Sequence, residues 1–226
     1  MLPFVIKDEV VNQTMHIEPL FPTPIGMTQI DKVLNKKILE FIKIKQLKFI
    51  KNTGGGGNSI SLDVNILEND ELSDIKKVLT DSVNQYFKEM VNNDKDTKLY
   101  ITNSWINVSK NGESHHAHKH PNSIVSAILY IDTCEGDTVS FIKEHTDVFG
   151  NLNFTVGHSE TKSTMYTENG RHIPVKNNLL TMFPSTLPHV VMPRPNTCTG
   201  TRISLSFNTW FKGTIGDSDS LTLLHL

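Results

Sequence analysis

The chain has 226 residues, of which 37% are hydrophobic and 20% are charged. That length is enough for one substantial core, so we expect a single domain over residues 1–226. With 22 Lys and Arg against 24 Asp and Glu, the net charge of -2 gives no electrostatic case for nucleic acid or an anionic membrane surface. No apolar run is long enough to span a bilayer, and residues 1–10 lack the pattern of a secretory signal. We therefore expect neither nucleic acid nor membrane as a partner.

The N-terminal 97 residues predict an extended lead-in and two supporting helices. The segment IEPLFPTPIGM contains three prolines, which exclude a helix and a central strand. From Gln29 to Phe49 apolar residues recur at a period close to 3.6, which predicts an amphipathic helix with Asp31 near its start. A second helix begins at Asn69 or Asp70 and ends near residue 92. Each helix has one apolar stripe, which a sheet or the other helix must cover.

Four consecutive glycines, Gly54 to Gly57, separate the two helices. A phosphate-binding loop would need a Lys-Ser/Thr pair that opens a helix, and no such pair follows here. We therefore interpret the stretch as a flexible connector.

From Lys98 onward the apolar period becomes that of strands. The runs are TKLYITNSWINVS, SIVSAILYID, DTVSFIKE, NFTVG, RHIPV, NLLTMFPS, HVVMP and RISLSFNTW. Many short runs separated by turns predict a sandwich or jelly roll, so the fold class is mainly β with N-terminal helices. We expect the jelly-roll core over residues 98–212, a polar insertion over 144–178, and a C-terminal tail over 213–226.

The two cysteines, Cys134 and Cys198, lie in unrelated contexts without the spacing of a zinc site. Two ordinary thiols suit a reducing compartment, and a disulfide between them is the less favoured alternative. We therefore expect a cytoplasmic protein.

The segment HHAHKHP, residues 115–121, holds four of the ten histidines of the chain. On an extended strand every second side chain lies on one face, so His116, His118 and His120 could converge on one ion while His115 points away. Neutral imidazole is the commonest protein ligand for zinc, iron, copper and nickel. The alternative is a solvated, histidine-rich loop.

A second polar group lies far downstream. His189 follows FPSTLP, and the strand that begins at Arg202 carries polar residues at every second position to Asn208. A polar row that faces inward is costly unless something there needs it. Arg202 offers a planar fork suited to a carboxylate, and Ser204 offers a hydroxyl on the same face. Because jelly-roll strands pair non-locally, His189 can face His118.

Three motifs carry a resemblance to a known family: HKHPNSIVSAILY at 118–130, FPSTLPH at 183–189 and RISLSFN at 202–208. With the LFPTP lead-in and the SWINV strand, they resemble the bacterial and phage branch of the Fe(II)/2-oxoglutarate-dependent oxygenases. The resemblance covers most of the chain. It implies a double-stranded β-helix (jelly roll) that holds non-haem iron, in the cytoplasm of a bacterial or phage-infected cell.

The resemblance also implies roles for individual residues. The metal ligands would be His118, His120 and His189. The contacts to 2-oxoglutarate would come from Arg202 and Ser204, with Tyr130, Ser126 and Asn107 as further candidates. The enzyme would be a dioxygenase that uses O₂ and 2-oxoglutarate to hydroxylate a prime substrate, either a protein side chain or a small molecule.

One position departs from the superfamily pattern. Two histidines and one carboxylate usually form the iron-binding triad, but the position two after His118 is His120. A three-histidine triad leaves the site one unit more positive. Two alternatives stay open: His120 does not bind the metal and an Asp or Glu enters from elsewhere, or His116 replaces His118.

Two rival functions remain. A cupin-type metalloprotein would fit Gly112 upstream of His118, although the Glu expected after the second histidine is missing and a cupin has no need of Arg202. A non-catalytic jelly roll, for example a virion-associated binding module, could hold a structural zinc at the same histidines. Edge strands of a jelly roll could also pair two copies in a homodimer.

Overall fold

Helices precede strands along the chain, as the sequence predicts. The computed structural model describes residues 19, 21–54, 56–91, 96–144, 164, 166 and 168–226. The N-terminal elements are β1 (Gly26–Gln29), α1 (Lys32–Ile44), β2 (Phe49–Lys51), β3 (Ser59–Ser61), the short 3₁₀ turns η1 (Ile66–Glu68) and η2 (Asp70–Leu72), and α2 (Ser73–Val91). Then follow β4 (Lys98–Ser109), β5 (His115–His118), β6 (Val125–Asp132), β7 (Thr138–Ile142), β8 (Gly170–Pro174), β9 (Leu179–Pro184), β10 (His189–Val191), β11 (Arg202–Lys212), β12 (Thr214–Ile215) and β13 (Leu224–His225).

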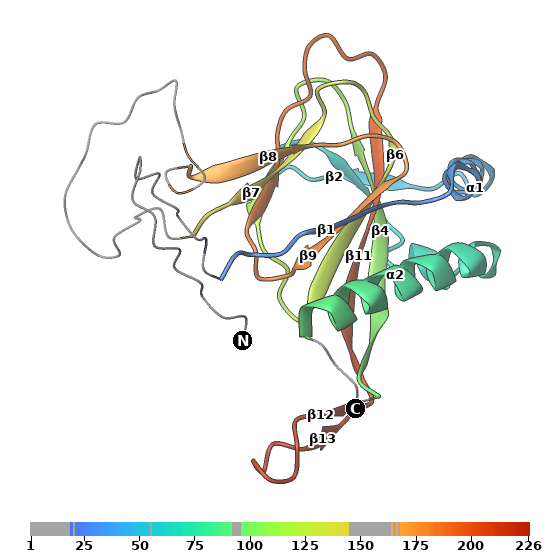
Figure 1. Ribbon diagram of the computed structural model, residues 1–226. Coiled ribbons are helices and arrows are strands. Elements are labelled where there is room, and N and C mark those ends of the chain that lie inside the picture. Colours follow the sequence, from blue (N-terminus) through green and yellow to red (C-terminus); the bar gives the residue numbers. More distant parts are fainter. Residues whose placement is uncertain are drawn as a thin grey trace, which may run out of the picture.

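Two antiparallel sheets form the body of the protein. The larger has seven strands in the order β1-β9-β6-β11-β4-β3-β2, and the smaller has four in the order β5-β10-β7-β8. Figure 1 shows α1 and α2 on one side of the larger sheet, with β7 and β8 on the other. The mainly β jelly roll with N-terminal helices is therefore confirmed. None of the helices in the described part of the chain is long and apolar enough to cross a bilayer.

The helices cover the outer face of the larger sheet. Asp31 caps α1 by accepting a hydrogen bond from the backbone N of Val33 at 2.8 Å. Ile38 of α1 and Leu79 of α2 are fully buried in one apolar cluster with Leu205 of β11. The two amphipathic helices predicted from the sequence are thus both present, and burial of their stripes fixes them to the sheet.

Strand β6 separates the two apolar clusters of the protein. Leu129 and Ile131 belong to the cluster that contains the helices, whereas Ile128 and Tyr130 belong to the cluster between the two sheets. This alternation is the period of two that a strand imposes on its side chains. A strand that is buried on both faces fixes the spacing between the layers, and the site described below lies on its inner side.

Most of the predicted strands are present, with some differences in their surroundings. The run NFTVG lies outside the described residues. Strand β8 falls inside the predicted insertion and pairs with β7, so this part of 144–178 belongs to the smaller sheet. The glycine-rich stretch connects the paired strands β2 and β3. Residues 213–226 contain the hairpin β12–β13, and the boundaries of the domain and its parts stay predictions.

The expectation of two free thiols was wrong. Cys134 and Cys198 form a disulfide, and their Cα atoms are 5.9 Å apart. Cys134 lies in the turn after β6 and Cys198 in the loop before β11. The sequence gives no signal for this pair, because the 64 residues between them are brought back only by the folding of the two sheets.

Candidate metal and cosubstrate site

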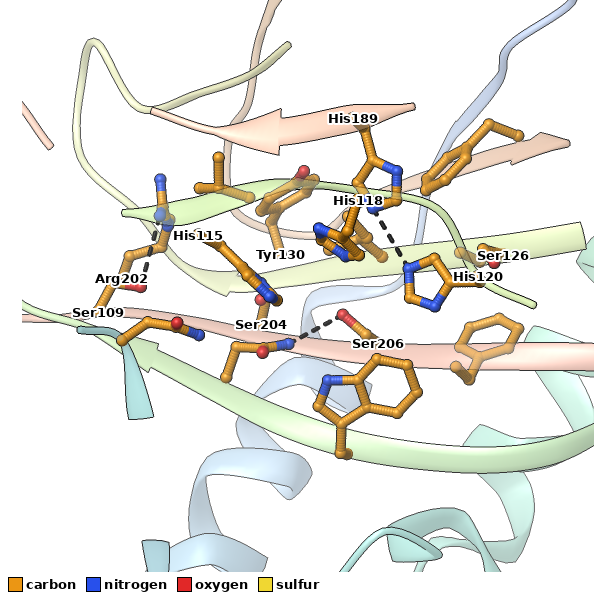
Figure 2. Close-up of a pocket in the computed structure, with 18 residues that line it drawn as sticks. Ser109, His115, His118, His120, Ser126, Tyr130, His189, Arg202, Ser204 and Ser206 are labelled. Atoms are coloured by element: carbon orange, nitrogen blue, oxygen red, sulfur yellow. Dashed lines mark hydrogen bonds between the residues drawn. The ribbon is translucent and has the colours of Figure 1, made fainter. Parts of the chain in front are cut away.

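A cavity between the two sheets collects most of the predicted site residues. The larger sheet contributes Trp105, Asn107 and Ser109 of β4, Ser126 and Tyr130 of β6, and Arg202, Ser204 and Ser206 of β11. The smaller sheet and the turn after β5 contribute His115, His118, His120 and His189. Figure 2 shows Arg202 and Ser109 at one end of the cavity and His120 at the other. The structure thus brings all eight predicted site residues to the same cavity.

Three imidazoles meet at one end of the cavity, which we call the histidine end (His118, His120 and His189). Each offers one nitrogen, and these nitrogens all lie within 4.8 Å of one another. The Nε2 atoms of His120 and His189 are 3.3 Å apart. The group contains no carboxylate, so among the described residues the arrangement favours a three-histidine set over a triad completed by Asp or Glu.

Backbone carbonyls fix the protonation of two of these rings. His118 Nδ1 lies 2.8 Å from the carbonyl oxygen of His116, and His189 Nδ1 lies 3.2 Å from that of Leu187. A carbonyl can only accept, so both Nδ1 atoms carry the proton and both Nε2 atoms keep a free lone pair. Metal-binding histidines are commonly oriented by such contacts at their second nitrogen. The donor set therefore fits a divalent metal ion.

Burial keeps the histidine end uncharged. Removal from water and, to a smaller extent, the neighbouring His118 lower the pKa of His189 to about 3 and that of His120 to about 4. The pKa of His118 is also lowered, again mainly by burial. At neutral pH all three rings are therefore neutral, which is the form that binds a metal.

A β-bulge changes which histidines of β5 face the cavity. His118 pairs with His189, but His115 pairs with Val191, so three steps along β5 lie opposite two steps along β10. As a result the His115 ring turns inward and stacks on that of His118, with centroids 4.2 Å apart. His116 is exposed instead. The expectation that His115 points away was wrong, because strict alternation holds only for an unbulged strand.

Three serines of the first two sequence motifs and Asn208 of the third form a buried hydrogen-bond network behind the histidine end. Ser126 Oγ donates to Asn208 Oδ1 at 2.8 Å and lies 2.8 Å from Ser185 Oγ, which in turn donates to Ser123 Oγ at 2.7 Å. The backbone N of His120 donates to the carbonyl oxygen of Ser185 at 3.0 Å. The network therefore ties the turn that carries His120 to β6, β9 and β11.

The opposite end of the cavity is charged, and we call it the arginine end (Arg202 with Asp137 and Arg194). Arg202 Nη1 donates to Asp137 Oδ1 at 3.3 Å, and Arg202 Nη2 lies 3.5 Å from Ser109 Oγ. Arg194 binds both oxygens of Asp137, at 3.1 and 3.2 Å. Of these three charged side chains only Arg202 lines the cavity, so it alone can present its charge to a bound anion.

Three buried polar atoms on the cavity wall lack a partner among the described residues: Tyr130 Oη, Asn107 Oδ1 and Asn58 Oδ1. Burial raises the pKa of the Tyr130 phenol, so it is a neutral donor. An unpaired buried polar group costs roughly 1–3 kcal/mol, which a polar ligand would recover. Tyr130 and Asn107 were predicted from the resemblance. Asn58 was not, because one asparagine after a glycine-rich stretch has no distinguishing pattern.

The cavity itself is narrow. Its volume is about 30 Å³, which is room for two or three water molecules. The ring of His115 lies between the two ends in Figure 2, and no hydrogen bond holds this side chain among the described residues. A five-carbon dicarboxylate that spans both ends would therefore have to displace it.

Comparison with known proteins identifies this architecture. Residues 103–208 match the family described as "Putative 2OG-Fe(II) oxygenase". These residues are a 2OG-Fe(II) oxygenase domain. It begins within β4 and ends within β11, so it contains every predicted ligand of the metal and the cosubstrate. No curated protein sequence matches the chain.

Solved structures share the fold of the oxygenase domain at low sequence identity. A prolyl-4-hydroxylase from Pseudomonas putida aligns with a TM-score of 0.54 and 13% identity, over 84% of this chain and 92% of its own. HygX from Streptomyces hygroscopicus, solved with nickel and 2-oxoglutarate, aligns with a TM-score of 0.56 and 8% identity, over 83% and 82%. A prolyl hydroxylase from Trichoplax adhaerens aligns with a TM-score of 0.52 and 12% identity, over 82% and 83%.

Proposed function

We propose that the oxygenase domain binds Fe(II) through His118, His120 and His189 and binds 2-oxoglutarate between that metal and Arg202. The observation that carries the proposal is the pairing, in one cavity, of a neutral three-imidazole donor set with a buried guanidinium at the other end. Metal and cosubstrate, when bound, would supply the activation of O₂ that hydroxylates a C–H bond.

The histidine end would hold the metal on one face. With Nδ1 of His118 and His189 donating to the backbone, their Nε2 atoms are left to bind a metal. The nitrogens that the three histidines offer lie within 4.8 Å of one another. Three neutral ligands leave a divalent ion at its full charge of +2, whereas a triad with one carboxylate would reduce it. Among the ligand sets that the sequence leaves open, the converging nitrogens support this one, and His116 is too exposed to replace His118.

The arginine end would orient the cosubstrate. Arg202 would pair with its distal carboxylate, and Ser204 and Tyr130 lie on the same cavity wall. The unpaired hydroxyl of Tyr130 is suited to donate to a carboxylate oxygen. The hydroxyl of Ser126 already donates to Asn208, so for this residue a role in holding the histidine end is better supported than contact with the cosubstrate.

The prime substrate is proposed only by class, as a protein side chain or a small molecule. The solved structures with this fold include both kinds, because one was crystallised with a peptide fragment of hypoxia inducible factor and another with hygromycin B. The fold therefore favours neither class. A homodimer, the absence of a membrane partner and a cytoplasmic location stay predictions.

The decisive experiment is an anaerobic titration of the Fe(II)-loaded protein with 2-oxoglutarate, followed by the weak visible charge-transfer band of the chelated cosubstrate. We expect the band in the wild type and its loss in Arg202→Ala, with Fe(II) binding retained in both. Arg171→Ala is the matched control, because Arg171 is exposed on β8 and does not line the cavity. This control should keep the band.

The other outcomes separate the rival functions. Iron binding without a band would favour the cupin-type metalloprotein. A tightly held zinc ion that does not respond to 2-oxoglutarate would favour a structural site in a binding module. Absence of any metal binding would overturn the catalytic proposal.

A further inference from the structure

The arginine end contains more charge than is needed to hold Arg202 in place. Asp137 is fully buried and binds two guanidinium groups, those of Arg194 and Arg202, whose side chains are 1% and 4% exposed. Two cations and one carboxylate sum to a net charge of +1. No other ion pair with either arginine is present among the described residues. A buried cluster with an uncompensated charge is costly unless an anion completes it.

The two arginines bind Asp137 in different ways. Arg194 takes both carboxylate oxygens of Asp137 through Nε and Nη2, and its Nη1 donates to the carbonyl oxygen of Gly200 at 2.9 Å. Arg202 has a single, longer contact with Asp137 at 3.3 Å. Bidentate pairs are the stronger ones. Asp137 is therefore matched by Arg194, which leaves the charge of Arg202 available.

Neither partner that sets this charge touches the cavity. Arg194 and Asp137 are absent from its lining, whereas Arg202 is part of it. If Arg194 carried no charge, Asp137 and Arg202 would form a neutral pair, and the cavity would lose its attraction for a carboxylate although every residue in contact with the ligand stayed in place. The influence of Arg194 must then act through Asp137 and Arg202.

We propose that Arg194 is a positioning residue that neutralises Asp137, so that Arg202 keeps one uncompensated positive charge for the distal carboxylate of 2-oxoglutarate. This inference rests on the proposed function. It adds a residue outside the cavity that sets the selectivity for a dicarboxylic 2-oxo acid over a monocarboxylic one. A salt bridge that served only to close the two loops would have no such effect on ligand choice.

The test is a charge series measured by anaerobic titration of the Fe(II)-loaded protein. Arg194→Gln makes the cluster neutral, and we expect the affinity for 2-oxoglutarate to fall by about 10-fold or more. The double variant Arg194→Gln with Asp137→Asn restores the net charge of +1, and we expect its affinity to return to within about 3-fold of the wild type. Fe(II) affinity should be unchanged in both variants.

A second ligand separates charge from general loosening of the site. The probe is 2-oxopentanoate, which has the same chain length but no distal carboxylate. Its affinity should change by less than about 3-fold across the series, because it places no charge near Arg202. If Arg194 had a purely structural role, Arg194→Gln would bind both ligands more weakly, and that result would overturn the proposal.

The remaining outcomes are also decisive. If Arg194→Gln does not fold, the test uses Arg194→Lys and the double variant, which both keep the net charge of +1. Both variants must still bind 2-oxoglutarate with an affinity within about 3-fold of the wild type. Folded variants of this kind that bind more than about 10-fold more weakly would overturn the proposal. If the wild type gives no 2-oxoglutarate band, the proposed function fails and this inference fails with it. If the wild type gives the band and Arg194→Gln binds 2-oxoglutarate with the same affinity, only this inference is overturned.

Discussion

The two ends of the cavity differ in how they use charge. The histidine end consists of neutral rings whose pKa values burial lowers to about 3 or 4 for His189 and His120. The arginine end consists of three buried side chains that are joined by ion pairs, Arg194, Asp137 and Arg202. At the histidine end the bound metal ion would bring the positive charge, whereas at the arginine end the protein supplies it.

This difference predicts where substitutions act. Neutral imidazoles cost little to bury, so changes at the histidine end should affect metal binding more than folding. Buried ions depend on one another, so changes at the arginine end should affect folding as well as ligand affinity.

Asp137→Ala should cost about 3–5 kcal/mol of unfolding free energy, because it leaves two buried guanidinium groups without their carboxylate. Equilibrium unfolding in urea measures the loss. Asp81→Ala is the control: Asp81 pairs with Lys77 on the surface of α2, where its side chain is 65% exposed, and its loss should cost less than about 1 kcal/mol. Equal losses in the two variants would contradict the contrast.

His189→Ala should lower the affinity for Fe(II) by about 100-fold or more, since loss of a residue that only orients a ligand already costs 10–100-fold. Its effect on the stability of the metal-free protein should be smaller than that of Asp137→Ala. Anaerobic metal titration and urea unfolding give the two numbers. His172→Ala, an exposed histidine on β8 that does not line the cavity, should bind Fe(II) as the wild type does.

Ser126→Ala should cost about 1–3 kcal/mol, because Asn208 and Ser185 lose a buried partner. Its affinity for 2-oxoglutarate should stay close to that of the wild type, whereas Ser204→Ala should lower the affinity for 2-oxoglutarate. A fall of about 10-fold or more for Ser126→Ala in the cosubstrate titration would instead support the contact that the sequence resemblance implies.

The metal-free protein should lose stability as the pH falls below 6.5. Burial, followed by the charge of His118, lowers the pKa of His115 to about 3 in the folded state, while the unfolded ring keeps a pKa near 6.5. Between those values the unfolded state binds more protons, so unfolding free energy rises with pH. His115→Asn should reduce this slope by at most about 1.4 kcal/mol per pH unit, measured by urea unfolding at pH 5 and pH 6. An unchanged slope would mean that His115 does not stay neutral in the fold.

Local patterns predict the parts of the fold whose contacts are local. The helical period of α1 and α2, the cap at Asp31 and the alternation of β11 are all visible in the sequence, and each is present. The candidate metal ligands were predicted from motif resemblance combined with the non-local pairing expected of a jelly roll. In the structure His118 and His189 are paired in the adjacent strands β5 and β10, which is the non-local pairing that was expected.

The parts that sequence reasoning missed depend on long-range packing. The inward turn of His115 follows from a bulge in the pairing with strand β10. No residue of β5 predicts this bulge from the sequence. Asp137 and Arg194 are 57 positions apart, and each alone is an ordinary loop residue in the sequence. The disulfide was the less favoured of two predictions for the same reason, because Cys134 and Cys198 meet only where these loops come together.

That disulfide bears on how the protein must be handled. Cys134 and Cys198 tie the turn before β7 to the loop before β11, the same two segments that Asp137 and Arg194 join. The backbone N of Cys134 also donates to Asp137 Oδ2 at 2.9 Å. Ferrous iron is kept reduced in an assay by an added reductant, and a thiol reagent would also attack this bond by exchange. Ascorbate would keep the iron ferrous without a competing thiol, so the choice between the two reagents decides which covalent form of the protein is studied.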